Sequence, residues 1–256
     1  MVGAASRLTK YGYSGSRRAL LKMKRSSALG SRVAPRLLLA VMLVAPAFAV
    51  SDPGLEKILA KMDETAAKFR TAQANFTWTT FNSVVNEESG RQTGKIYFQR
   101  NGNGTEMAAD IDAPDAQQVI FSRGKIQVYK SKTDIVNEYN AGAHRDEFEA
   151  FLVLGFGSSG DDMRKSFDIT YGGEEKVDGT DTARLELIPK SDKVRQHFPH
   201  IILWINPQTG ISVQQKLMET DGDYRLAKYS DIRLGQKIPA KLFQLKTTGK
   251  TTVVTH

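Results

Sequence analysis

From Phe76 onward the sequence consists mainly of short β-rich segments separated by turn residues, a pattern that leaves few possible folds. Ser122-Arg123-Gly124-Lys125 is predicted to join two of these segments as a tight hairpin turn. Because the connections are too short for crossover helices, the strands should pair antiparallel. Strands are predicted at 93–100, 105–111, 117–122, 125–130, 134–139, 167–172, 183–189, 199–205, 211–219, 224–233 and 241–247.

Two segments depart from this strand pattern. Asp52-Pro53 is typical of a helix start, because Asp can cap the free amides and Pro tolerates the first helical position. Apolar residues then recur at spacings of three and four: Leu55, Ile58, Leu59, Met62, Ala66 and Phe69. The second departure, residues 145–166, is rich in Phe and Leu and is broken by glycines. The sequence therefore predicts one α+β domain, with a single large antiparallel sheet, an N-terminal helix and a mid-chain helical insert.

The N-terminal region has the pattern of an export signal. Residues 37–49 form a 13-residue apolar run that ends in Ala47-Phe48-Ala49, a small-x-small cleavage site. Such a run spans only about 20 Å as a helix, too short for a membrane core of about 30 Å. We expect residues 1–49 to be removed and residues 50–256 to form the mature domain in the periplasm. Translation starting at Met23 and a twin-arginine signal at Ser16–Lys22 remain alternatives.

Composition and motifs argue against several kinds of chemistry. The chain has no cysteine, which excludes disulfides, thiolate metal sites and an N-terminal lipidated cysteine. Residues 1–50 hold nine Lys and Arg and no acidic residue, so the remaining chain has 27 basic and 28 acidic residues and suggests no nucleic-acid partner. The glycines of Gly155–Gly160 match a dinucleotide motif but lack its strand and helix context, and His197 and His200 are too few for a metal site. We expect a protein without catalytic residues, metal or cofactor, and not an enzyme.

Arg100 closes an apolar stripe in the predicted strand 93–100. Ile96, Phe98 and Arg100 share one face because side chains alternate along a strand. Arg100 has two interpretations at this stage. It can extend along the sheet rim into solvent, as long basic side chains commonly do, or it can reach across a cavity to backbone carbonyls of a lid.

Five segments in order resemble the LolA-like family of periplasmic outer-membrane lipoprotein carriers, over nearly all of residues 52–256. They are the helix from Leu55, the Phe76 strand with Gly94–Arg100, the hairpin Ser122–Tyr129, the insert Leu152–Gly157, and the strand and turn Ile202–Gly210. The resemblance implies a sheet curved into an incomplete β-barrel, covered by the N-terminal helix and a mid-chain helical lid around an apolar cavity. It also implies that Arg100 holds the lid, although Asn101-Gly102-Asn103-Gly104 replaces the usual proline after it.

From the resemblance we expect a monomeric carrier that shields the acyl chains of lipoproteins. It would accept them from an inner-membrane exporter complex and deliver them to an outer-membrane acceptor. A carrier of another lipid and an envelope-stress sensor domain that binds a membrane partner are the alternatives. The residues expected to line the cavity and contact acyl chains are Leu59, Met62, Phe69, Trp78, Ile96, Phe98, Phe148, Phe151, Leu152 and Phe156.

Overall fold

The structure is a computed structural model that describes residues 52–102, 104–140, 142 and 153–256. Its strands are β1 (Thr71–Asn82), β2 (Glu87–Asn101), β3 (Gly104–Ala113), β4 (Gln117–Ser122), β5 (Lys125–Lys130), β6 (Ile135–Asn140), β7 (Phe167–Val177), β8 (Thr180–Pro189), β9 (His200–Asn206), β10 (Ile211–Met218), β11 (Tyr224–Leu234) and β12 (Thr252–Thr255). Its helices are α1 (Pro53–Lys68), α3 (Gly160–Ser166), α4 (Asp192–Arg195) and the 3-10 helix η2 (Ala240–Phe243). None of the helices in these residues is long and apolar enough to cross a membrane.

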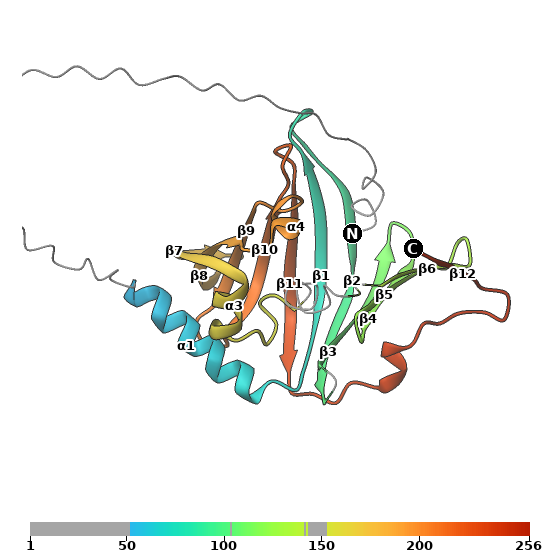
Figure 1. Ribbon diagram of the computed structural model, residues 1–256, viewed down its shortest axis with the longest axis horizontal. Helices are drawn as coiled ribbons and strands as arrows, with labels where there is room; N and C mark the ends of the chain where they lie inside the picture. The colour runs from blue at the N-terminus through green and yellow to red at the C-terminus, as the bar shows by residue number, and fades with distance from the viewer. Residues whose placement is uncertain (1–51, 103, 141, 143–152) are drawn as a thin grey trace, which may run out of the picture. The chain divides into compact units, whose positions relative to one another are not determined.

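All twelve strands belong to one curved sheet (Figure 1). Its order is β12-β6-β5-β4-β3-β2-β1-β11-β10-β9-β8-β7, so β1 beside β11 joins the two halves of the chain. Neighbours pair antiparallel as expected, except that β12 runs parallel to β6. The two ends of the order, β12 and β7, are not paired with each other in the part of the chain that the structure describes. The sheet is thus an unclosed barrel, which confirms the predicted α+β fold class.

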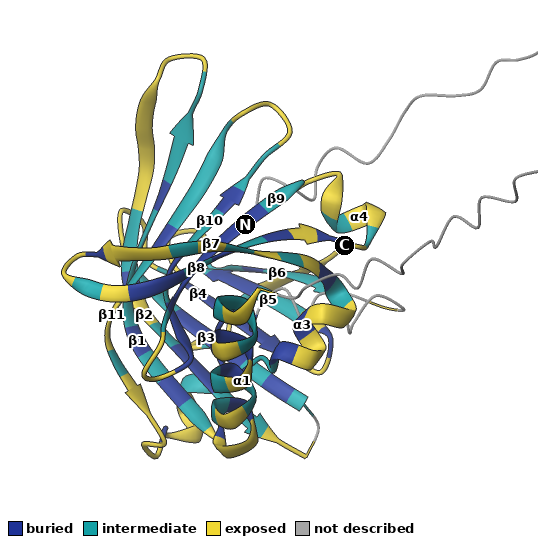
Figure 2. Ribbon diagram, turned by 90° about the vertical axis from the view of Figure 1, so that its left-hand side faces the viewer, coloured by how far each residue is buried: buried dark blue, intermediate teal, exposed yellow. Residues whose placement is uncertain are grey.

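Helix α1 begins as the sequence predicts and covers one face of the sheet, here called the inner face. The Asp52 carboxylate accepts hydrogen bonds from the amides of Gly54 at 2.7 Å and Leu55 at 3.3 Å. The apolar side of the helix, including Leu59 and Met62, is buried against the strands. Figure 2 shows α1 lying across the buried middle of the strands, while the ends of the long hairpins are exposed.

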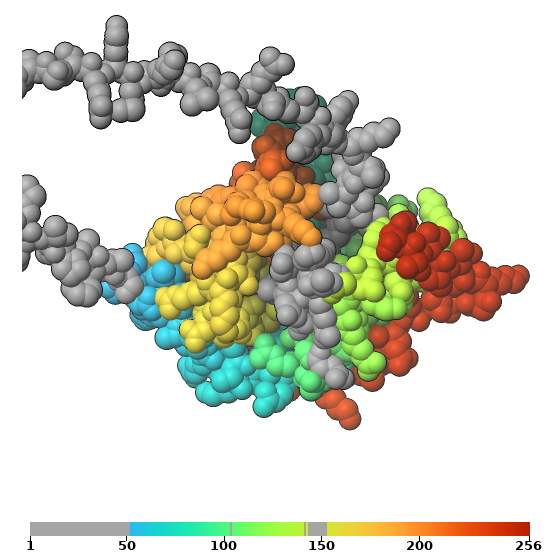
Figure 3. Space-filling view, viewed as in Figure 1, coloured from blue at the N-terminus to red at the C-terminus, as the bar shows by residue number. Residues whose placement is uncertain are grey.

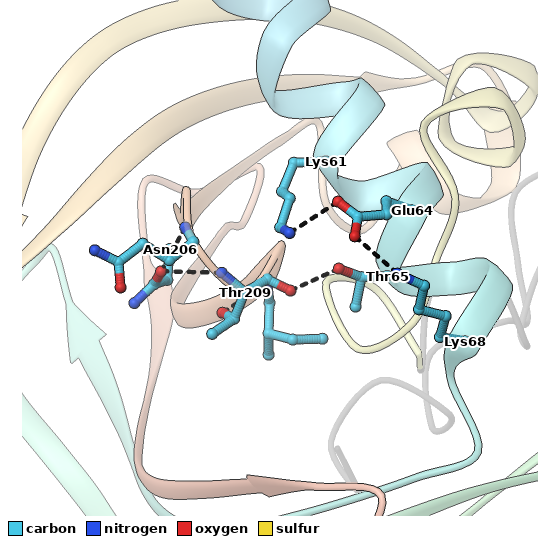
Figure 4. A network of polar contacts seen from close by, with 8 residues as sticks. Lys61, Glu64, Thr65, Lys68, Asn206 and Thr209 are labelled. Carbon is cyan, nitrogen blue, oxygen red and sulfur yellow. Dashed lines mark hydrogen bonds and ion pairs between the residues drawn. The ribbon is translucent and has the colours of Figure 1, made fainter.

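The β9–β10 turn holds the outer side of α1 (Figure 4). Thr65 Oγ1 donates a hydrogen bond to the Thr209 carbonyl at 2.7 Å. On the same helix Glu64 lies about one turn from Lys61 and one turn from Lys68, and each lysine Nζ is 2.9 Å from a Glu64 carboxylate oxygen. These hydrogen bonds lower the pKa of Glu64 to about 2. The contribution of these bonds to stability is therefore complete above about pH 4.5, declines as the pH falls below that value, and is gone below about pH 2.

The predicted strand at 241–247 is wrong. Residues 240–243 instead form the 3-10 helix η2, which follows Pro239. Leu242, Phe243 and Leu245 pack against Tyr97 and Ile120 on the outer face of the sheet. Because these three residues cover apolar side chains on the outer face, their sequence has the same short apolar pattern as a strand. The chain then adds β12 at the sheet edge, four residues that the sequence pattern did not indicate.

Candidate functional site

The inner face of the sheet carries two apolar clusters. Cluster 1 contains Leu59 and Met62 from α1, with Trp78 of β1 partly buried against it. Cluster 2 contains Phe69, Phe98 and Phe156, with Ile96 packed at its side. The structure therefore places seven of the residues expected to contact acyl chains on one face, divided between two clusters. The other three, Phe148, Phe151 and Leu152, lie outside the described residues.

A short stretch of chain, Val153–Gly157, bridges the two clusters; we call it the inner segment. Leu154 belongs to cluster 1, whereas Val153 and Phe156 belong to cluster 2. The Phe156 ring stacks on Phe98 with centroids 4.6 Å apart and meets the Tyr229 ring edge-on at 4.8 Å. Only 1% of Phe156 is exposed. The inner segment thus occupies apolar surface between the two halves of the sheet, where it excludes other apolar groups.

Arg100 connects the inner segment to α1 from the end of β2. Its Nη2 donates to the Gly157 carbonyl at 2.7 Å and its Nη1 donates to the Ala66 carbonyl at 2.9 Å. The guanidinium also lies 5.3 Å from the centre of the Phe69 ring. A planar fork with five donors suits such a bridge, because two carbonyls can accept from one side chain. The side chain of Arg100 is therefore not extended freely along the rim.

Strand β10, which β1 and β11 separate from β2 in the sheet, holds the other end of the inner segment. The Ser212 amide donates to the Gly155 carbonyl at 2.9 Å, and Gln215 Nε2 donates to the Leu154 carbonyl. Sequence reasoning missed Gln215. The available signal was a glutamine two residues before the apolar Leu217, on the same side of a strand.

Helix α3 continues directly from the inner segment and packs beside α1, as Figures 1 and 3 show. Its first amide, that of Gly160, donates to Asp63 Oδ1 at 2.8 Å. Arg164 Nη2 lies 2.5 Å from Glu56 Oε1. These contacts join α3 to α1, so the two helices can cover the inner face as one layer.

The backbone of the inner segment requires glycine at position 157. Gly157 has φ +80°, and a Cβ placed there would lie 2.5 Å from Cγ of the buried Phe69 ring. We expect Gly157→Ala to lower the free energy of unfolding by about 1–3 kcal/mol, through backbone strain and displacement of the ring. Urea denaturation measures this change. Gly102→Ala is the control, since a Cβ at Gly102 meets no atom within 4 Å. Equal effects of the two substitutions would contradict the tight packing of the inner segment.

A surface cleft of about 720 Å³ lies away from this region, between α1 and the strands β7 and β8. Charged groups of both signs line it, among them Lys57, Glu174 and Asp181, and it includes none of the residues expected to contact acyl chains. Among the described residues, no three His, Asp or Glu side chains gather as a metal would require. His200, singled out in the sequence, lies instead 3.3 Å from Glu186.

The fold is thus an α+β domain in which one unclosed sheet curves around a helix and an apolar inner segment. The chain belongs to the family of the outer membrane lipoprotein carrier protein LolA, whose pattern it matches over residues 67–246. The comparison with curated proteins found no match.

Solved structures resemble the chain at low sequence identity, and the one with a TM-score above 0.5 shows the same fold. An uncharacterized conserved protein from Thermus thermophilus is 11% identical with a TM-score of 0.51, covering 78% of this chain and 98% of that one. MucB is 16% identical with a TM-score of 0.49. The match covers 76% of this chain but only 64% of the length of MucB. The lipoprotein LppX of Mycobacterium tuberculosis is 12% identical with a TM-score of 0.42, covering 74% of this chain and 99% of that one.

Proposed function

We propose that the protein is a periplasmic carrier that shields the acyl chains of lipoproteins and delivers them to the outer membrane. In this proposal residues 1–49 are a signal peptide cleaved after Ala49, and residues 50–256 are the carrier domain. The domain accepts cargo from an inner-membrane exporter and releases it to an outer-membrane acceptor. The function is binding rather than catalysis. Membership of the LolA family supports it.

The observation that carries the proposal is the way the apolar inner face is closed. Phe156 and Leu154 cover it, and the carbonyls of their segment accept side-chain hydrogen bonds from Arg100 and Gln215 and one backbone hydrogen bond from Ser212. Such bonds break and re-form without disturbing the sheet. Release of the inner segment would expose the surfaces of both clusters to a ligand.

Acyl chains are suitable occupants of that surface. Burial of an acyl chain contributes about 0.8 kcal/mol per CH₂ group, which is enough to replace the contacts of Phe156 and Leu154. The inner segment competes with cargo for the same apolar surface. The affinity for cargo is therefore moderate, and the cargo can be passed on. We propose that Leu59, Met62, Phe69, Trp78, Ile96 and Phe98 contact the chains directly.

Dye binding tests the proposed function. The mature protein should enhance the fluorescence of an acyl-mimicking dye, and a tri-acylated lipopeptide should compete the dye off. The same peptide without acyl chains is the control and should not compete. A folded protein that binds no dye would contradict the proposal. If dye binds but only lipids extracted with the native protein compete, the cargo is another lipid.

A further inference from the structure

We infer that Gln215 is a second positioning residue, which holds the inner segment closed from β10 as Arg100 does from β2, and that Tyr229 orients Gln215. As far as cargo release is concerned, the inference rests on the proposed function. The local closing of the inner segment does not depend on what the protein carries.

Gln215 points to the inner face because of a local irregularity in β10. The pairing of β9 with β10 shifts register between Ser212 and Gln214, so Val213 packs on the outer face whereas Leu217 packs in cluster 1. Gln215 shares the inner side with Leu217. An amide among apolar groups is unfavourable unless its donors and acceptor are satisfied. A polar side chain at this position therefore needs specific partners.

Both ends of the Gln215 amide have such partners. Nε2 donates to the Leu154 carbonyl, and the Tyr229 hydroxyl lies 3.3 Å from Oε1. The orientation is fixed by the partners, because a backbone carbonyl can only accept. Burial raises the pKa of the Tyr229 phenol, so its hydroxyl stays protonated and can donate to Oε1. Tyr229 thereby turns the NH₂ group of Gln215 toward the inner segment.

Tyr229 also contacts the inner segment itself. Its ring meets Phe156 edge-on at 4.8 Å, so one tyrosine touches both the aromatic side chain and the glutamine that holds the backbone. Arg100 binds the Gly157 carbonyl from β2, and Gln215 binds the Leu154 carbonyl from β10. Opening of the inner segment must break both contacts, because Phe156 lies between the two bound carbonyls.

Hydrogen exchange of the cargo-free protein tests the inference. The substitution Gln215→Met keeps the side-chain length and removes both hydrogen bonds. We expect exchange of the Phe156 and Ser212 amides, which donate to Val153 and Gly155, to accelerate about three- to tenfold. Tyr229→Phe should give a smaller acceleration at the same amides. Gln127→Met is the matched control, since Gln127 donates to Glu138 on strand β6.

Two exchange results would overturn the role of Gln215. One is equal exchange of these amides in Gln215→Met and Gln127→Met. The other is equal acceleration in the inner segment and in the buried strand β9, which would indicate general destabilisation.

The second part of the experiment measures release of the acyl-mimicking dye. Gln215→Met should release bound dye about three- to tenfold more slowly than Gln127→Met, because closing of the inner segment drives release. Faster exchange with an unchanged dissociation rate would overturn the link between Gln215 and release. A wild-type protein that binds no dye would overturn the proposed function, and the exchange rates would still decide the role of Gln215.

Discussion

Replacing Arg100 by leucine should slow the release of acyl cargo by about tenfold to a hundredfold. Arg100 donates to the Gly157 carbonyl of the inner segment, a bond that opening of the segment would break, and to the Ala66 carbonyl of α1. Hydrogen bonds to charged groups contribute about 1.5–3 kcal/mol each, and packing of the leucine offsets part of their loss. A net change of about 1.4–2.8 kcal/mol in the closed state corresponds to the expected factor. The cargo-bound state of our proposal lacks the bond to Gly157, so the substitution weakens the closed state more than the cargo-bound state.

Stopped-flow dissociation of the acyl-mimicking dye, and transfer of a lipopeptide to acceptor vesicles, measure the release rate. Arg70→Leu is the matched control, because the Arg70 guanidinium donates to the carbonyl of its own neighbour, Phe69, at 2.9 Å. If Arg100→Leu and Arg70→Leu release cargo at the same rate, Arg100 only supports the packing of α1. Both variants should keep the circular dichroism spectrum of the wild type.

Alanine substitutions of Phe98 and Phe156 should have similar effects on the free energy of unfolding but opposite effects on dye affinity. Phe98 and Phe156 are both 1% exposed and stack on each other, so either change to alanine should lower the free energy of unfolding by about 3–5 kcal/mol. Their effects on dye binding should be opposite. Phe156→Ala weakens only the segment that cargo displaces and should raise dye affinity, whereas Phe98→Ala removes part of the binding wall and should lower it.

Urea denaturation and dye titration measure the two effects on the same samples. Phe98→Leu and Phe156→Leu remove less volume and preserve the comparison if an alanine variant does not fold. Equal losses of dye affinity at the two positions would show that Phe156 belongs to the binding wall, and would contradict the displacement of the inner segment by cargo.

Local patterns in the sequence were sufficient for much of the fold. The Asp52 cap and the apolar spacing of α1 predict a helix because both depend on neighbouring residues alone. The hairpin turn at Arg123 and Gly124 was predictable for the same reason, and both residues have positive φ. Alternation also predicted that Ile96, Phe98 and Arg100 share a face, the observation that links Arg100 to the inner segment.

Features set by contacts distant in the sequence were not predictable in this way. The parallel pairing of β12 with β6 joins residues more than 100 positions apart. The sequence pattern of 241–247 predicts a strand, whereas Leu242, Phe243 and Leu245 pack on the outer face without joining the sheet. Gln215 escaped notice because its importance depends on the Leu154 carbonyl and the Tyr229 hydroxyl, which only the fold brings to it.

Acyl chains should take the place of the inner segment when cargo binds, and hydrogen exchange with bound cargo tests this displacement most directly. The amides of Phe156 and Ser212 should be compared in the cargo-free protein and in the protein saturated with a tri-acylated lipopeptide. Because both amides donate to carbonyls of the inner segment, we expect cargo to accelerate their exchange at least about tenfold. Strand β9, in the wall of the sheet, should keep its protection. Saturable binding that leaves these two amides unchanged, or protects them further, would contradict the claim.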